Sequence, residues 1–122
     1  ALCTLRSKDE EAEKYFDLGQ NAIDDKEKIK YFTKSIELMP DRAGAYNNRG
    51  IAKRKLGQYQ SAIEDYTKAI QLKPNLSEPY YNRGIAYSLL GDKNNQIKDY
   101  KKAAQLGNKN CQNWLKKNGY TW

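Results

Sequence analysis

The sequence has no histidine and only two cysteines among its 122 residues. Without histidine, the chain lacks the commonest general base, the commonest metal ligand and the side chain that most often titrates near neutral pH. Cys3 and Cys111 stand near opposite ends and form no CxxC motif, so they do not supply the ligand set of a zinc site. The sequence also has neither a paired catalytic constellation nor a phosphate-binding loop. We therefore expect a protein that is not an enzyme and that uses no metal or cofactor.

Long apolar runs are missing as well. No stretch approaches the roughly 18 apolar residues that span a bilayer, so no membrane span is expected. The opening Ala1-Leu2-Cys3 resembles the end of a bacterial lipoprotein signal, but Leu2 stands where such signals have a small residue. We expect a trimmed N-terminus, with lipidation as the alternative. The cellular compartment stays open, with the cytoplasm favoured.

Positive charge is abundant but unevenly placed, and the formal net charge is +7. Residues 1–42 contain 8 basic and 10 acidic side chains, residues 43–76 contain 6 and 2, and residues 77–122 contain 8 and 3. An acidic N-terminal part (1–42) and a basic remainder (43–122) would steer an acidic partner toward the protein or favour head-to-tail contact between copies. The alternative is an ordinary solvated helical surface.

An internal repeat of 34 residues organises the chain. When residues 43–76 are placed on residues 77–110, 15 positions are identical. In the first of these units, apolar residues recur at helical spacing in two stretches, one ended by Gly57 and the other by Pro74. Each unit is therefore predicted to be a pair of helices, and the small residue Gly50 allows the two helices to approach closely.

The repeat also extends backwards, but with a slip. Gly19 corresponds to Gly50, although a strict 34-residue spacing would place that glycine at position 16. The first unit is therefore about three residues short, and the loss lies between Ala22 and Lys28. We expect a tightened turn around Asp24.

The run AYNNRGIAKRKLGQYQSAIEDYTKAIQLKPN resembles the consensus of the tetratricopeptide repeat (TPR), whose period is also 34 residues. The resemblance implies an all-α fold, a right-handed superhelix of three helix-turn-helix units followed by a C-terminal capping helix. Trp114 would pack in this cap where the next repeat's aromatic residue would lie. The expected segments are an N-terminal extension (1–8) and a single TPR domain (9–122), with repeats at about 9–42, 43–76 and 77–110 and a capping helix at about 111–118.

The same resemblance implies a concave groove lined by the first helix of each pair. Asn48 and Asn82 are 34 residues apart, and an amide can donate to and accept from a peptide bond whatever the peptide's sequence. The alternatives are that these amides face water or neighbouring loops, and that the apolar residues form core contacts between repeats. The predicted groove residues are Phe16, Gln20, Asn47, Asn48, Ile51, Arg54, Lys55, Tyr81, Asn82, Ile85, Leu89 and Lys116.

Some TPR proteins clamp the acidic C-terminal tail of chaperones with lysine, asparagine and arginine side chains at five positions. Of the five matching positions here, only Asn48 keeps the expected residue type. The other four are Phe16, Gln20, Glu78 and Asn82. We therefore do not expect that clamp.

Two arginines near the groove are expected to be structural. Arg49 and Arg83 each precede an aspartate by sixteen residues, whereas the first unit lacks both the arginine and the aspartate. Because the arginine and the aspartate occur together in two units and are both missing from the first, we predict that they form ion pairs within the repeats. These pairs join Arg49 to Asp65 and Arg83 to Asp99.

The function expected from these observations is a non-catalytic protein–protein interaction scaffold that binds a peptide or protein segment in the concave groove. The partner would be a peptide with apolar anchors and acidic residues. One alternative is a basic surface that binds nucleic acid or acidic partners, suggested by the net charge of +9 on residues 43–122, although no nucleic-acid motif accompanies it. The basic residues of this part gather in two clusters, Lys53, Arg54 and Lys55, and Lys98, Lys101 and Lys102. Another alternative is self-assembly into a homo-oligomer through the ends of the array.

Overall fold

The computed structural model describes the backbone of residues 2–122 and the side chains of residues 7–122. Within these residues the chain is all-α, as predicted, with seven helices and no strand. The helices are α1 (Leu2–Asn21), α2 (Asp25–Leu38), α3 (Ala43–Lys55), α4 (Tyr59–Leu72), α5 (Ser77–Leu89), α6 (Lys93–Gln105) and α7 (Lys109–Lys117).

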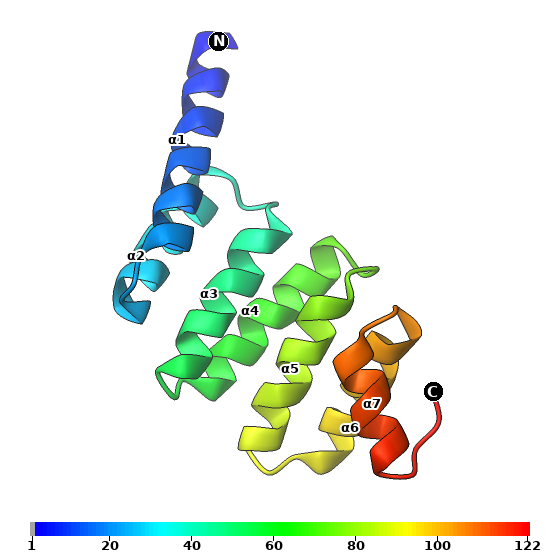
Figure 1. The fold of residues 1–122 in the computed structure, drawn as a ribbon. Helices are drawn as coiled ribbons and strands as arrows, with labels where there is room; N and C mark the ends of the chain where they lie inside the picture. The colour runs from blue at the N-terminus through cyan, green and yellow to red at the C-terminus, as the bar shows by residue number, and fades with distance from the viewer. Residues whose placement is uncertain (1) are drawn as a thin grey trace.

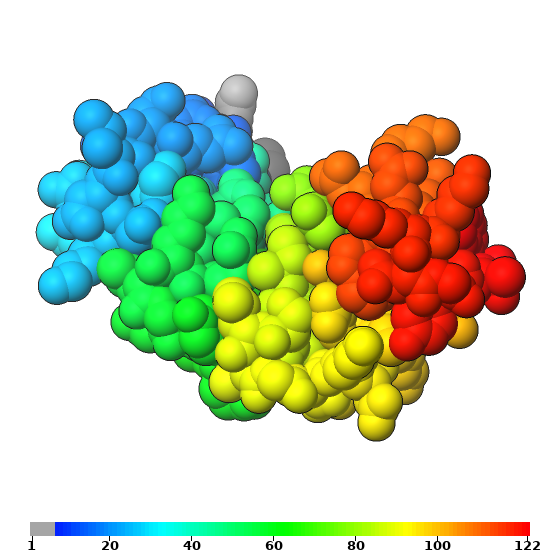
Figure 2. Space-filling view, turned by 60° about the horizontal axis from the view of Figure 1, so that its bottom comes forward, coloured from blue at the N-terminus to red at the C-terminus, as the bar shows by residue number. Residues whose placement is uncertain are grey.

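The helices pack in chain order, each one against the next. Three helical hairpins lie side by side, and α7 covers the last of them (Figure 1). Figure 2 shows that the resulting surface is hollowed between its N-terminal and C-terminal ends. This arrangement is the right-handed helical-repeat architecture expected from the sequence, including its C-terminal capping helix.

A close contact between a glycine and an aromatic ring holds each hairpin together. A Cβ atom built on Gly50 would lie 2.6 Å from a ring carbon of Tyr66, nearer than real Cβ atoms approach. Because only glycine leaves this space open, the two helices can pack with the ring directly against the backbone. The three contacts join Gly19 to Phe32, Gly50 to Tyr66 and Gly84 to Tyr100.

The first hairpin closes differently from the others. Gly57 and Gly91 follow α3 and α5 with positive φ angles of 81° and 79°, as C-terminal glycines commonly do. No glycine follows α1, and instead the Lys28 amine donates hydrogen bonds of 3.3 Å to the carbonyl oxygens of Gly19 and Gln20. A cation at this helix end also suits the negative pole of the helix dipole. Lys28 therefore caps α1.

The expected tightened turn is wrong, because residues 22–24 between α1 and α2 are as many as residues 56–58 and 90–92 in the other two pairs. The three missing residues instead shorten the C-terminal end of α1 after Gly19.

The predicted arginine–aspartate pairs are present, and each reaches a third helix. Arg49 on α3 donates two hydrogen bonds of 2.8 and 2.7 Å to Asp65 on α4. It donates another of 3.2 Å to Thr33 on α2, which belongs to the preceding repeat. The hydrogen bonds to Asp65 raise the pKa of the Arg49 guanidinium. The equivalent set in the next repeat is Arg83 with Asp99 and Thr67.

The C-terminal helix α7 buries Leu115 completely against the last hairpin. Trp114 packs edge-on against Tyr100 of α6, with ring centroids 5.1 Å apart. The Trp114 ring also stacks on Tyr120, at 6.1 Å and an interplanar angle of 3°. Trp114 thus forms the aromatic contact predicted for the cap, while Trp122 is 45% exposed.

At the other end, residues 2–8 continue α1 without a break, so the segment expected as an N-terminal extension is helical from Leu2. The Cys3 side chain lies outside the described residues. In the part of the chain that the structure describes, no helix combines the length and apolarity that crossing a bilayer requires.

The buried Cys111 gives a testable consequence of this packing. Burial raises the pKa of its thiol to about 12. Because the thiolate is the reactive form, we expect Cys111 to resist iodoacetamide in the folded protein at about pH 8.5, where a free cysteine is about half ionised. Mass spectrometry of the Cys111 peptide should show alkylation only after denaturation. Rapid alkylation of the native protein would contradict the close packing of α7.

Candidate functional site

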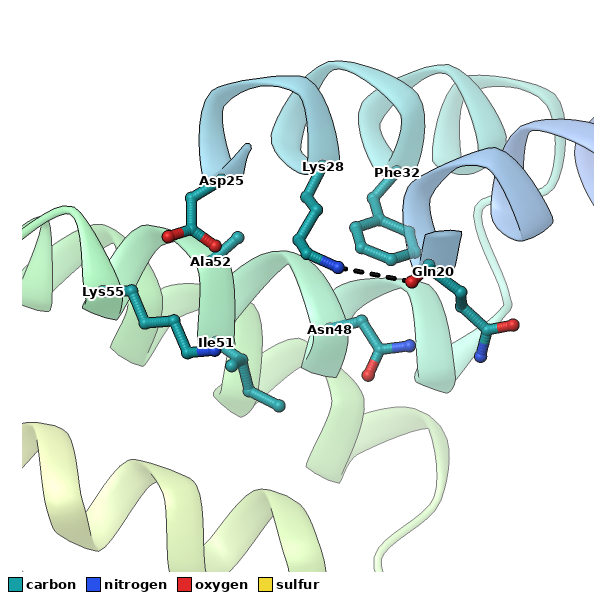
Figure 3. Close-up of a pocket in the computed structure, with 8 residues that line it drawn as sticks. All are labelled: Gln20, Asp25, Lys28, Phe32, Asn48, Ile51, Ala52 and Lys55. Atoms are coloured by element: carbon teal, nitrogen blue, oxygen red, sulfur yellow. Dashed lines mark hydrogen bonds between the residues drawn. The ribbon is translucent and has the colours of Figure 1, made fainter. Parts of the chain in front are cut away.

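A pocket of about 280 Å³ lies where α1 ends and α2 begins, beside α3. We call it the α1–α3 pocket. Lys28 and Phe32 point from α2 toward α3, which contributes Asn48 and Ile51 (Figure 3). The pocket unites four of the predicted groove residues with four others. Its lining consists of Gln20, Asp25, Lys28, Phe32, Asn48, Ile51, Ala52 and Lys55.

A second pocket, of about 310 Å³, lies between the N-terminal ends of α3 and α5. We call it the α3–α5 pocket. It is lined by Ala43, Gly44, Asn47, Asn48, Leu76, Ser77, Glu78 and Pro79. Asn48 borders both pockets and is half-buried, and no hydrogen bond joins its amide to any other described residue. Its donor and acceptor are therefore free to serve a ligand.

The two amides predicted as a ladder are unequal in the structure. The Asn82 amide donates a hydrogen bond of 3.1 Å to the side-chain oxygen of Asn47. Both of these residues are buried, with 6% and 7% of their surface exposed. Asn82 and Asn47 thus join α5 to α3, and of these three asparagines only Asn48 presents an unpaired amide.

The predicted apolar residues divide between the repeat interfaces and the surface. Phe16 is buried, with its ring 5.7 Å from that of Phe32 and under the guanidinium of Arg42, so it forms part of the contact between repeats. Tyr81 and Ile85 are half-buried against the C-terminal core. Ile51, Leu89 and Lys116 complete the predicted set: Ile51 is half-buried, Leu89 is half-exposed and Lys116 on α7 is exposed.

The basic cluster at the end of α3 is split by the fold. The Lys53 amine lies 3.0 Å from Asp65, so it is paired inside the second repeat and does not face the groove. Lys55 is exposed at the α1–α3 pocket. Arg54 is half-buried, and its Nε atom is buried without a hydrogen-bond partner. The three consecutive cations thus have three different environments.

Acidic side chains lie on the flanking helices. Glu13 of α1 pairs with Arg42, which directly precedes α3, and the hydrogen bond from Arg42 lowers the pKa of this exposed carboxyl. Glu78 is exposed in the first turn of α5 and borders the α3–α5 pocket. Among the residues that the structure describes, no group of cysteine and carboxylate side chains could hold a metal ion.

Sequence reasoning missed the contribution of α2 to the α1–α3 pocket. The groove was assigned to the first helix of each pair, whereas Asp25, Lys28 and Phe32 come from a second helix. The available signal was the three-residue slip in the first repeat, because it ends α1 sooner after Gly19 than α3 ends after Gly50.

Comparisons with known proteins agree with this architecture. Two models of the tetratricopeptide repeat match the chain, one at residues 43–76 and the other at residues 65–105. The curated relatives include Tetratricopeptide repeat protein 36 of Danio rerio, which is 46% identical over 37 residues. That match spans 30% of this chain and only 20% of the relative, so it concerns one part of each protein.

Solved structures extend the likeness to most of the chain. The Arabidopsis OM64 TPR domain superposes with a TM-score of 0.86 at 26% identity, covering 90% of this chain and 95% of that domain. The second TPR of Spaghetti (RPAP3), bound to the HSP90 peptide SRMEEVD, gives a TM-score of 0.79 at 26% identity, covering 84% and 97%. Together with the matched repeats and the glycine–aromatic hairpins, these comparisons show that the chain belongs to the tetratricopeptide-repeat family.

Proposed function

We propose that this chain is a non-catalytic interaction scaffold that binds an extended peptide segment of another protein in its concave groove. The observation that carries the proposal is the unpaired amide of Asn48, which lies between two pockets. An amide offers one acceptor and two donors, so it can pair with both polar groups of a peptide bond. The peptide backbone would be held at Asn48, and its side chains would enter the pockets on either side.

The sizes of the pockets favour side chains of a peptide over a small-molecule ligand. Their volumes of about 280 and 310 Å³ lie at or below the lower end of the about 300–1,000 Å³ typical of small-molecule sites. Phe32, Ile51 and Ala52 give the α1–α3 pocket an apolar wall. An aliphatic or aromatic anchor fits this lining, and the neighbouring Lys55 suits an acidic residue beside the anchor.

The similar TPR of Spaghetti is bound to an acidic peptide, SRMEEVD, which supports a peptide as the class of ligand. This chain differs at the positions of the chaperone clamp. Phe16 and Asn82 are buried there, and Glu78 brings a negative charge. We therefore propose a peptide of different sequence, one that is read mainly at Asn48 and the α1–α3 pocket.

The test is the substitution Asn48→Ala, which removes the amide without disturbing another described contact. As probe we would use a library of N-acetylated, C-amidated heptapeptides with Leu, Phe, Ser or Glu at each position, followed by anisotropy measurements on the peptides that the wild-type protein retains. The dissociation constant should rise about tenfold, because the peptide group loses its hydrogen bonds in a partly buried site.

The matched control is Asn94→Ala, which removes an exposed asparagine of α6. Both variants should keep the wild-type melting temperature, and Asn94→Ala should also keep its affinity. Equal binding by wild type and Asn48→Ala would remove Asn48 from the site. Retention of no peptide by the wild-type protein, from this library or from one with free C-termini, would contradict the proposed function itself.

A further inference from the structure

Among the arginines whose side chains the structure describes, Arg54 in the last turn of α3 is the one that no carboxylate pairs with. Its Nε atom is buried and makes no hydrogen bond, and no ion pair joins its guanidinium to any described carboxylate. The other arginines with described side chains each donate two hydrogen bonds to one carboxylate. Those pairs are Arg42 with Glu13, Arg49 with Asp65 and Arg83 with Asp99.

The surroundings of Arg54 explain why no internal acid reaches it. Asp65, on the neighbouring helix, already binds both Arg49 and Lys53. The hydroxyl of Tyr66 is also buried without a hydrogen-bond partner, and burial raises its pKa, an effect that the nearby Arg54 partly opposes. Arg54 and the Tyr66 hydroxyl therefore lie near each other, and no described carboxylate pairs with either of them.

An arginine that lies partly buried without a carboxylate partner does not stabilise the fold. The buried Nε atom of Arg54 has lost its hydration, and this loss is recovered only when a carboxylate or another acceptor replaces the water. The same chain satisfies three other arginines with aspartate or glutamate, so the lack of a partner at Arg54 is specific to this place. A ligand that brings its own carboxylate would supply the missing acceptor.

We infer that Arg54 is the anion contact of the groove and that it receives a carboxylate from the bound peptide. This inference rests on the proposed function and names the ligand's chemistry: an extended peptide bearing an acidic side chain or a free C-terminus. The planar guanidinium can hold a carboxylate through two parallel hydrogen bonds, which selects for geometry as well as charge.

The charges around the groove favour a peptide over a nucleic acid. Asp17 is exposed on α1 and Glu78 is exposed on α5, whereas the charge of Glu13 is paired with Arg42. A polyanion lying across these helices would meet repulsion on both sides of Arg54. A peptide can place a single carboxylate at Arg54 and uncharged or basic residues beside the acidic helices.

The first experiment separates a ligand contact from a structural role by thermal unfolding. Arg54→Met keeps the length and apolar stem of the side chain and removes the unpaired charge. We expect its melting temperature to equal or exceed that of the wild type, whereas Arg83→Met should lower it by about 10 °C because Asp99 loses its partner in a buried site. A comparable fall for Arg54→Met would show that Arg54 is needed for the fold and would overturn the inference.

The second experiment reads the carboxylate directly with three heptapeptide libraries of Leu, Phe, Ser and either Glu or Gln. The first has Glu and an amidated C-terminus, the second has Gln and a free C-terminus, and the third has Gln and an amidated C-terminus, so it bears no carboxylate. The wild-type protein should retain the first or the second about tenfold better than the third. A preference for the first library would identify a side-chain carboxylate as the ligand of Arg54, and a preference for the second would identify the C-terminal carboxylate.

Arg54→Met should retain all three libraries at the level of the carboxylate-free one. The control Lys68→Gln, which removes an exposed cation from α4, should keep the wild-type preference. A preference that survives in Arg54→Met would contradict the role of Arg54 while leaving peptide binding intact. Retention of none of the libraries by the wild type, or Arg54-dependent binding of an oligouridylate instead, would overturn peptide binding and the inference together.

Discussion

Replacing Asp65 with alanine is expected to destabilise the protein by about 3 kcal/mol and to lower its melting temperature by about 10 °C. Asp65 is 4% exposed and accepts two hydrogen bonds from Arg49 while pairing with Lys53. Removing the carboxylate leaves two partly buried cations without their common partner, and the penalty of such unpaired charges exceeds the modest worth of an ordinary hydrogen bond. Thermal and urea unfolding followed by circular dichroism would measure the change.

The matched control for Asp65→Ala is Glu13→Ala, which breaks an ion pair with Arg42 at the surface. The Glu13 side chain is 55% exposed, so water and salt screen its charge and the melting temperature should barely move. If Asp65→Ala proved as mild as Glu13→Ala, the set of Arg49, Asp65 and Thr33 would not be what joins the first and second repeats.

Replacing Gly50 with alanine is expected to cost about 2 kcal/mol of folding free energy. The new Cβ would lie 2.6 Å from one ring carbon of Tyr66 and 2.9 Å from the next, so the ring or the helix has to shift. Tyr66 is fully buried at the centre of its repeat, which leaves the ring little space to move. Equilibrium urea unfolding would measure the loss as a lower midpoint.

Gly44→Ala is the natural comparison, because Gly44 lies in the same helix but is exposed. There the new Cβ would be 3.7 Å from Phe16, which is ordinary van der Waals contact. Alanine is a better helix former than glycine by about 1 kcal/mol, so this variant should be neutral or slightly more stable. Two glycine-to-alanine changes within one helix would thus act in opposite directions. Equal effects of the two would contradict the close contact between Gly50 and Tyr66.

The repeating features of the fold could be predicted because they recur at a fixed spacing. Gly50 and its counterpart Gly84 mark where the helices of a pair touch, and the joint occurrence of Arg49 with Asp65 was enough to predict their ion pair. Each of these interactions lies within one repeat, so comparing equivalent positions reveals it. Thr33, which also accepts a hydrogen bond from Arg49, was not anticipated, since it belongs to the preceding repeat.

The features that could not be predicted join positions that are not equivalent. Asn82 was expected to match Asn48, because the two are 34 residues apart, but its hydrogen bond goes to Asn47. The neighbouring repeat has Tyr81 at the position equivalent to Asn47, so this amide pair forms once and no periodicity indicates it. Lys28 is similar: it caps α1 because that helix, unlike α3 and α5, ends without a following glycine.

In the candidate site, too, the features that recur in every repeat could be predicted and the features that occur once could not. The family resemblance directed attention to the first helices, but it treated their groove positions as equally available. Packing decides otherwise, because Phe16 fills a repeat interface while Asn48 retains an unpaired amide. Arg54 stands out only when the partners of all the described arginines are compared in space. Specificity in this array is therefore expected to come from the residues that break its repeat.

The central claim, that a peptide lies in the concave groove at Asn48, is tested most directly by nuclear magnetic resonance. ¹⁵N-labelled protein would be titrated with the best-retained heptapeptide of the libraries. Shift changes should concentrate at Gln20, Asn48, Ile51 and Lys55, including the side-chain amide signals of Asn48. Changes confined to outward-facing residues such as Lys68 and Asn94, with Asn48 unmoved, would contradict it.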